Sequence, residues 1–399
     1  MAGSLNRTFG LFPVVGFLIM GTGLSFFSVR ESNSVVSKSP GTVRKVLGKV
    51  KGRLEDRFPF HDNVIEWYGG LLRVLGRRAF NNTVFLKNGM LARESRVLPV
   101  QGLFECLADE AKWCSTNGFS FLFALAPEKM DLDLTLAPPG FRFDANAAGG
   151  RFVRELSGFG VDTLDLRRQF AADAEAVSRN FFRTDIHWNF NSAREAAAII
   201  ATRLGAMLDD PDAVTNRVLA AENWAPHGSS RVFLGANARR TGSLFCAREA
   251  VTWYTPRFET RMSREKTGRD AISGTFEEVV MSQAILKALR NGTNLDDANE
   301  LYGGGGGKVM TFRNPGAPSR KRIVVVKDSF GRVVASFLSA VFGEVTLMDP
   351  RRDGWSKGEF KRVIFERRPD VVLEVFNAVL VCREPNARNR GYFDWNHAR

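Results

Sequence analysis

Three short apolar runs near the C-terminal end constrain the fold more than any other feature of the sequence. They lie in "RIVVVKDSF", "EVTLMD" and "PDVVLEVFN", and the amphipathic segments "GRVVASFLSAVFG" and "SKGEFKRVIFERR" separate them. Continuous apolar strands that alternate with helices predict a parallel sheet covered on both faces, the α/β class. Such sheets bind ligands at the carboxyl ends of their strands, so functional residues are expected directly after these runs.

The N-terminal half adds further elements of the same kind. Two more strands are predicted in "FSFLFALAP" and "VDTLDL", and a helix at Leu103–Thr116. In "NTVFLKNGMLA", Asn88-Gly89 is a turn signal between two short apolar runs, which predicts a hairpin. Residues 207–310 show no consistent periodicity and are interpreted as an insertion of uncertain structure.

The N-terminus predicts a membrane segment. Phe9–Val29 carries no charge and is just long enough to span a bilayer. We interpret it as an uncleaved signal anchor, with a cleaved signal peptide as the alternative. The predicted organisation is then a cytoplasmic tail at residues 1–8, a linker at 30–56 and one catalytic domain at 57–399.

Charge and cysteine content limit the classes of function. The net charge of +13 fits an anionic polymer or an anionic membrane surface as partner. Charge alone does not separate polysaccharide from nucleic acid, but the sequence has no zinc finger, RNP sequence or basic zipper, so no nucleic-acid partner is predicted. The four cysteines form no CxxC or Cys/His cluster, and "YGGGGGKV" fails the P-loop pattern, so neither a metal nor a cofactor is predicted.

One of only four histidines stands in a context that suggests catalysis. In "FFRTDIHWNFNSAREAAAII", Asp185 lies two positions before His187. A carboxylate at this distance can fix the tautomer of the imidazole and stabilise its protonated form. Ser192 with Glu195 is interpreted as a capping box, which would place the pair in a loop at a helix start. A purely structural histidine remains the alternative.

Ser329 is the candidate nucleophile. It follows the apolar run Ile323–Val326 and precedes a predicted helix, at the carboxyl edge of the sheet. A helix N-terminus offers backbone N–H groups and positive potential to a developing oxyanion. The alternative is a Ser that only caps the helix.

Together these segments resemble the SGNH hydrolases, and in their order the alginate O-acetyltransferase AlgJ/AlgX family. The Asp/His segment precedes the Ser segment here, a circular permutation of the usual order. The resemblance covers roughly residues 57–205 and 310–380, and "TDIHWNFNSAREAAAIIATRL" carries it best. It implies an SGNH hydrolase-like three-layer fold with a parallel sheet and an N-terminal transmembrane anchor.

The resemblance also implies roles for the residues. Ser329 would carry the acetyl group, His187 would act as general base, and Asp185 would orient it. Weaker candidates for the oxyanion site or substrate binding follow the second and third strands or the histidine: Arg352, Gly354, Asn377 and Trp188. For Asn377 the alternative is a structural role in a turn at the strand end. Trp188 is either a packing residue or a platform on which a sugar stacks, and the two are equally favoured.

Lys327 and Met90 depart from the family pattern. Lys327 stands where the family usually has a small residue, and its bulk could alter the oxyanion pocket. Met90 replaces the usual Trp of the family's hairpin. For Lys129 a surface position is favoured, and a side chain that reaches the site is the alternative.

The implied function is O-acetylation of an extracellular polysaccharide such as alginate. The acceptor would be the polysaccharide, and a membrane-bound O-acyltransferase would be the partner that supplies acetyl groups. The domain would face the periplasm from the inner membrane of a Gram-negative bacterium. A polysaccharide acetylesterase of the same fold and a catalytically inactive polysaccharide-assembly protein are the alternatives.

Overall fold

The computed structural model describes residues 61–96, 103–215, 217–267, 269–304, 307–352, 355 and 358–381. The chain divides into two compact units, Met1–Val64 and Ile65–Arg399, and the second carries the fold described below. The expected anchor at residues 9–29, the tail before it and the linker after it lie outside the described residues. Among the residues that the structure does describe, no helix combines the length and the apolar character needed to cross a bilayer.

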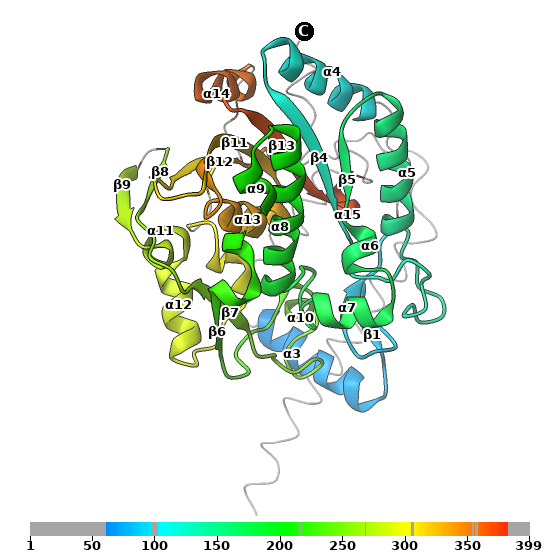
Figure 1. The fold of residues 1–399 in the computed structure, drawn as a ribbon. Helices are drawn as coiled ribbons and strands as arrows, with labels where there is room; N and C mark the ends of the chain where they lie inside the picture. The colour runs from blue at the N-terminus through cyan, green and yellow to red at the C-terminus, as the bar shows by residue number, and fades with distance from the viewer. Residues whose placement is uncertain are drawn as a thin grey trace, which may run out of the picture. The chain divides into compact units, whose positions relative to one another are not determined.

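An eight-stranded sheet forms the centre of the second unit (Figure 1). Its strands, in spatial order, are β5 (Thr163–Asp165), β4 (Ser120–Ala126), β13 (Val371–Asn377), β11 (Ser319–Lys327), β12 (Phe342–Met348), β10 (Val309–Arg313), β8 (Met262–Lys266) and β9 (Arg269–Gly274). The first five strands are parallel, as predicted. The last three are antiparallel, and two of them come from the stretch 207–310 that the sequence left unassigned.

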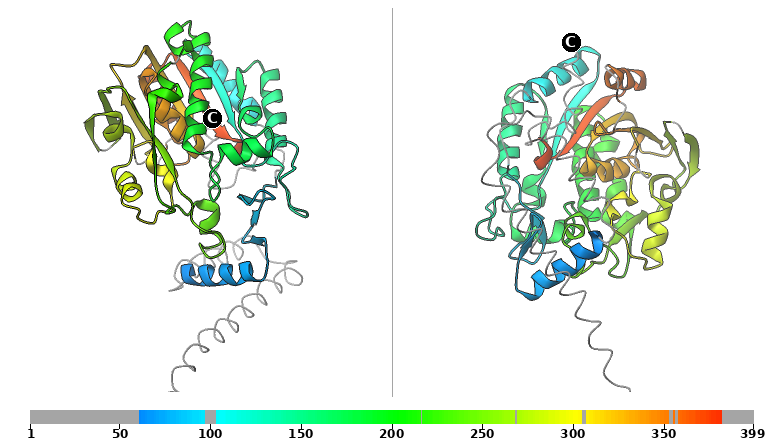
Figure 2. Two further views of the ribbon diagram at one scale, coloured as in Figure 1. Left: turned by 60° about the horizontal axis from the view of Figure 1, so that its bottom comes forward. Right: turned by 180° about the vertical axis from the view of Figure 1, so that it is seen from behind.

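Helices cover both faces of this sheet, which gives the predicted three layers (Figure 2). One face packs on α8 (Phe190–Met207) and α13 (Ser329–Leu338), and the other on α4 (Leu103–Thr116), α5 (Ala145–Gly158) and α14 (Glu359–Arg367). Side chains alternate between the two cores along each strand, so Ile323 and Val325 join the first and Val324 and Val326 the second. This double burial explains why the strands read as continuous apolar runs.

A small antiparallel sheet holds the predicted hairpin. It consists of β1 (Ala79–Phe80), β2 (Thr83–Phe85) and β3 (Leu91–Arg93), and it follows the helix α3 (His61–Val74). Gly89 has a φ of 81°, the left-handed conformation that the turn requires. The hairpin is therefore confirmed.

The remaining elements are short. They are α6 (Arg167–Phe170), α7 (Ala174–Asn180), α9 (Pro211–Thr215), α10 (Ala236–Arg239), α11 (Phe276–Val280), α12 (Gln283–Arg290), α15 (Ala378–Val381), the strand pair β6 (Trp224–Gly228) and β7 (Thr252–Pro256), and 3₁₀ turns at Arg217–Leu219, Ala221–Asn223 and Ala298–Leu301.

The start of α8 differs from the prediction. The helix begins at Phe190, and its cap is Asn189, whose side chain accepts a hydrogen bond from the Ser192 N–H at 3.0 Å. Ser192 instead donates its hydroxyl to Asn180 at 3.1 Å, so the predicted capping box with Glu195 is wrong. The conclusion drawn from it holds, because His187 still lies in a loop just before a capped helix.

Candidate active site

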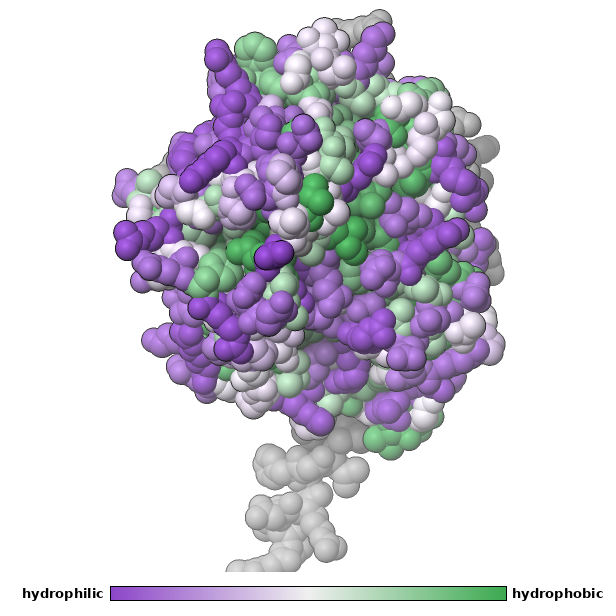
Figure 3. All heavy atoms as spheres, in the orientation of Figure 1, coloured by the Kyte–Doolittle hydropathy of each residue, from purple (hydrophilic) through white to green (hydrophobic). Residues whose placement is uncertain are grey.

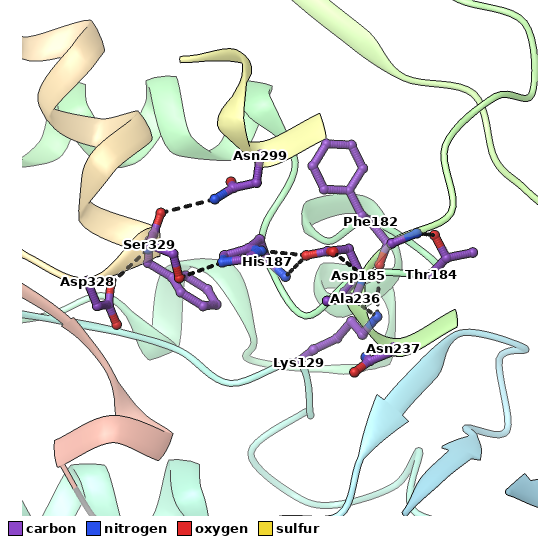
Figure 4. Close-up of polar contacts among 12 residues, drawn as sticks. Lys129, Phe182, Thr184, Asp185, His187, Ala236, Asn237, Asn299, Asp328 and Ser329 are labelled. Atoms are coloured by element: carbon purple, nitrogen blue, oxygen red, sulfur yellow. Dashed lines mark hydrogen bonds and ion pairs between the residues drawn. The ribbon is translucent and has the colours of Figure 1, made fainter. Parts of the chain in front are cut away.

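Ser329, His187 and Asp185 meet in one chain of hydrogen bonds (Figure 4). The Nε2 of His187 lies 2.7 Å from the Ser329 Oγ, and its Nδ1 lies 2.5 Å from the Asp185 Oδ1. The serine and the histidine are 142 positions apart in the sequence. The predicted convergence of the two segments is confirmed, with the carboxylate on the far side of the ring from the hydroxyl.

Asp328 shapes the turn that presents Ser329. Its carboxylate caps α13 by accepting from Phe330 N at 2.7 Å and Gly331 N at 3.3 Å, and it also accepts from Asn377 N at 2.8 Å. The helix cap is therefore Asp328, and Ser329 is the first helical residue. The Ser329 N–H is thus one of the unpaired donors of a helix N-terminus, where positive potential favours a negative oxygen.

Gly331 allows α13 to lie this close to the sheet. A Cβ at this position would stand 2.7 Å from the Cβ of Lys327 and 2.8 Å from the Cβ of Val375. Either approach is closer than side chains tolerate, so a larger residue would push the helix start, and Ser329 with it, away from the strand ends.

Asp185 is held as an ionised acceptor. The residue is 2% exposed, and its side chain accepts from the backbone N–H of His187 at 2.9 Å and of Ala236 at 2.6 Å. Burial on its own would raise the pKa of this carboxyl, but the charge of His187 and these hydrogen bonds hold it well below its usual range. Asp185 therefore stays charged at neutral pH and can orient the imidazole.

Lys129 is not a surface residue, and this prediction was wrong. The side chain is 2% exposed, and its ammonium donates to the backbone carbonyls of Phe182 at 2.9 Å, Arg183 at 3.2 Å and Asp185. Burial lowers the pKa of Lys129 to about 8, against the charges of Glu249 and Asp185, which raise it. A charge can be buried here because carbonyl oxygens replace its water.

Residues 207–310 hold the same loop from its other side. The Glu249 carboxylate accepts from the backbone N–H of Arg183 at 2.8 Å and of Thr184 at 2.6 Å. The Thr184 hydroxyl oxygen accepts in turn from Gly235 N at 3.0 Å. The segment from Phe182 to Asp185 is therefore fixed by backbone contacts on both sides, none of which has a sequence signature.

Asn299 is a further residue that the sequence did not reveal. It lies in the 3₁₀ turn Ala298–Leu301, it is 1% exposed, and its Nδ2 donates to the Ser329 carbonyl at 3.3 Å. Figure 4 shows this contact on the side of Ser329 away from Asp328. The two residues thus hold the nucleophile turn from opposite sides.

Lys327, the last residue of β11, forms a buried ion pair. It is 2% exposed, and its ammonium lies 2.9 Å from the carboxylate of Asp349, the residue after β12. Burial lowers the pKa of Lys327 to about 8, although Asp349 raises it. Its ammonium therefore has a carboxylate partner at the end of the neighbouring strand β12. Arg352 lies nearby, half exposed and 3.8 Å from the same carboxylate, and Gly354 lies outside the described residues.

Trp188 and Asn377 both have structural contacts. Trp188 is fully buried and packs edge-on against Phe170 and Phe330, so of its two predicted roles the packing role fits and the sugar platform does not. The Asn377 amide donates to Pro127 O at 2.7 Å and accepts from Val379 N at 3.0 Å, which fits the strand-end turn.

Comparison with solved structures gives the fold. Bacillus cereus PatB1 with a sulfonyl adduct matches with a TM-score of 0.60 and 17% identity, covering 77% of this chain and 98% of that one. A DHHW family protein from Eubacterium siraeum matches with a TM-score of 0.51 and 15% identity, covering 78% and 95%. The O-acetyltransferase domain of Pseudomonas putida AlgJ has a TM-score of 0.44 and 12% identity, covering 80% and 99%. No curated protein matches the chain.

The family is identified by its sequence model. The model of the SGNH hydrolase-like domain of the acetyltransferase AlgX matches residues 84–286. The match spans half of the chain and includes Asp185 and His187, while Ser329 lies beyond it. The chain therefore belongs to the AlgX family of SGNH hydrolase-like acetyltransferase domains.

Proposed function

We propose that this protein is an O-acetyltransferase that moves an acetyl group, through a serine acyl-enzyme, onto hydroxyls of an extracellular polysaccharide such as alginate. The observation that carries the proposal is the hydrogen-bonded chain Ser329–His187–Asp185 in a member of this acetyltransferase family. A nucleophile, a base and an orienting acid in this order are the requirements for acyl transfer.

In the first half-reaction Ser329 Oγ attacks the acetyl carbonyl of the donor. A bond forms between Oγ and the carbonyl carbon while the proton of Oγ passes to His187 Nε2, 2.7 Å away. The bond from the carbonyl carbon to the donor oxygen then breaks, and His187 returns the proton to the leaving group. Such general-base assistance is typically worth about 10²–10⁴ in rate.

In the second half-reaction a sugar hydroxyl attacks the acetyl-serine. His187 takes the proton of that hydroxyl, the new ester bond forms, and Ser329 leaves as an alcohol with the proton that His187 returns. Asp185 stays ionised throughout and stabilises the imidazolium in both steps. The Ser329 N–H at the start of α13 is the donor proposed for the oxyanion, and Arg352, Gly354 and Asn377 remain candidates for the surrounding substrate contacts.

The setting follows from the same proposal. The acetyl group would reach Ser329 from a membrane-bound O-acyltransferase, and residues 9–29 would tether the domain in the periplasm to the inner membrane. The uncharged stretch in the sequence and the family membership support this arrangement.

An assay in which water and a sugar acceptor compete for the acetyl group distinguishes acetyl transfer from hydrolysis. Purified protein is incubated with an acetyl ester, with and without alginate oligosaccharide, and free acetate and oligosaccharide mass are followed. The proposal predicts that the oligosaccharide gains acetyl groups and that Ser329→Ala abolishes the gain. Release of acetate with no acetylated oligosaccharide under any condition would show that the protein is an esterase instead.

A further inference from the structure

An exposed apolar face lies on α3, at the opposite side of this helix from its packing contacts. Trp67, Leu71 and Val74 are 68%, 40% and 85% exposed, and Leu75 and Leu244 beside them are 65% and 50% exposed. Positions 67, 71 and 74 fall on one side of a helix with 3.6 residues per turn, and Leu75 directly follows the end of α3. In Figure 3 one small apolar patch lies at the lower edge of the molecule, where Figure 1 places α3.

The helix is fixed in this orientation. A Cβ on Gly69 would lie 2.0 Å from the Thr241 carbonyl oxygen, so backbone meets backbone here. The Glu66 carboxylate accepts from the backbone N–H of Ser243 at 2.7 Å and of Leu244 at 2.8 Å. Because these contacts occupy the inner side of the helix, Trp67 and its apolar neighbours cannot rotate inward to bury themselves.

A basic pocket adjoins the apolar face. It has a volume of about 750 Å³, Leu244 is shared with the face, and none of the described residues that line it is acidic. Three arginines do: Arg73, Arg78 and Arg183. Arg73 lies over the Phe85 ring at 4.6 Å, and Arg78 donates to the Leu86 carbonyl at 3.2 Å.

The described part of the chain supplies no carboxylate partner to the arginines of this pocket. Arg183 donates to the Cys246 Sγ at 3.1 Å and to the Ala247 carbonyl, both uncharged groups. Within the described ranges, none of the three guanidinium groups forms an ion pair with a carboxylate. Three guanidinium groups around one cavity of this size have the chemistry that binds an anionic group such as a phosphate.

We propose that the apolar face of α3 and the three-arginine pocket together dock on an anionic phospholipid bilayer. The side chains of Trp67, Leu71, Val74 and Leu75 would enter the boundary between headgroups and acyl chains, and the pocket would bind a lipid phosphate. Tryptophan and leucine flanked by arginine are the composition of surfaces that lie in this interface. The arginines of the pocket lie beside this apolar face, and the surface of an anionic bilayer is negative. This charge complementarity favours a lipid surface over a protein partner.

The test must use the whole chain, in which residues 9–29 could bind lipid independently. Sedimentation with vesicles therefore does not suffice, and depth is measured instead. Val74→Cys is labelled with a polarity-sensitive fluorophore, and the chain is reconstituted into vesicles of phosphatidylglycerol and phosphatidylcholine that carry acyl-chain quencher lipid. Phe365→Cys, 53% exposed on α14, is the matched label position, and the chain without an added cysteine gives the background.

The proposal predicts a blue shift and strong quenching at position 74 and neither at position 365. Arg73→Gln with Arg78→Gln should weaken the quenching, by roughly fivefold in apparent affinity for each arginine, and pure phosphatidylcholine should weaken it similarly. Arg261→Gln with Arg362→Gln makes the same change in net charge at two exposed positions and should leave the quenching unchanged.

Three outcomes would overturn the proposal. Equal signals at positions 74 and 365 would show that the face stays in water. A blue shift at position 74 without vesicles would show that another part of the chain, or a second copy, covers it. Binding of inorganic phosphate that depends on Arg73 and Arg78, without quenching in vesicles, would make the pocket a site for soluble anions.

Discussion

The ammonium group of Lys129 donates a hydrogen bond to the backbone carbonyl of Asp185, so a buried cation from the end of β4 holds the loop that carries the candidate catalytic acid. It also contacts the carbonyls of Phe182 and Arg183, and it touches neither Ser329 nor His187 in any hydrogen bond of the described residues. Its role is therefore positioning.

Lys129→Met is expected to lower kcat by roughly 10–100-fold, because hydrogen bonds from a charged donor are worth about 1.5–3 kcal/mol and their loss lets the loop drift. KM should change little. Since the pKa of Lys129 is about 8, the ammonium is intact below that pH and deprotonates above it. Activity of the unaltered protein should therefore fall above pH 8, and this limb should be absent in the variant.

Lys87→Met is the control for this prediction. Lys87 is an exposed lysine that also donates to one backbone carbonyl, that of Thr135 at 2.8 Å. It should leave both kcat and the pH profile unchanged. If Lys129→Met kept the alkaline limb and its full kcat, the positioning role would be wrong.

Asn299→Ala is expected to slow the reaction of Ser329 about tenfold, because the Ser329 carbonyl loses its donor and the helix start is freer to shift. Asn314→Ala is the matched control: Asn314 is also buried, and its Nδ2 donates to the Ser339 carbonyl at 3.0 Å, away from the Asp185 loop. Both variants should lose similar stability in thermal unfolding, and only Asn299→Ala should lose kcat per folded molecule. Equal losses of kcat in the two variants would show that Asn299 has no specific role in positioning Ser329.

Glu374→Gln is expected to stabilise the protein in a pH-dependent way. Glu374 and Glu110 face each other in the core between the sheet and α4, and both are buried. Burial raises the pKa of Glu374 to about 8, and burial with the charge of Glu374 raises the pKa of Glu110 well above its usual value. These groups keep their protons when folded and lose them when unfolded, so the stability that they contribute is present below about pH 4.5 and is lost as the pH rises through 8.

Glutamine needs no proton, so the melting temperature of Glu374→Gln should exceed that of the unaltered protein by a few degrees. The difference should grow between pH 5 and pH 8, and the double variant with Glu110→Gln should show the flattest profile. Glu366→Gln, at a residue 56% exposed on α14, is the control. A difference that does not depend on pH would contradict the raised pKa values.

The parts of the fold and site that local sequence patterns encode could be predicted. The strands β4, β11, β12 and β13 were visible as apolar runs, and Ser329 and His187 could be placed because each stands at a recognisable junction between a helix and the segment before it. Parallel sheets form their sites at the carboxyl ends of the strands, so the two residues could be expected to meet there.

The supporting contacts could not be predicted, for a physical reason. Ala236 acts through its backbone N–H, so its side chain carries no signal. Glu249 and Asn299 lie in a stretch of short elements without periodicity, and their partners are backbone groups far along the chain. Lys129 looks like a surface residue in the sequence because only the folded loop supplies the carbonyl oxygens that replace its water.

The most direct measurement of the central claim is the covalent state of Ser329. The protein is mixed with an activated acetyl ester, quenched in acid within the first turnover, digested, and examined by mass spectrometry. We predict one added acetyl group on the peptide that contains Ser329, lost in Ser329→Ala and strongly reduced in His187→Ala, and removed when acceptor oligosaccharide is added before the quench. An unmodified Ser329 peptide during active turnover, or acetyl transfer at full rate by Ser329→Ala, would contradict the account.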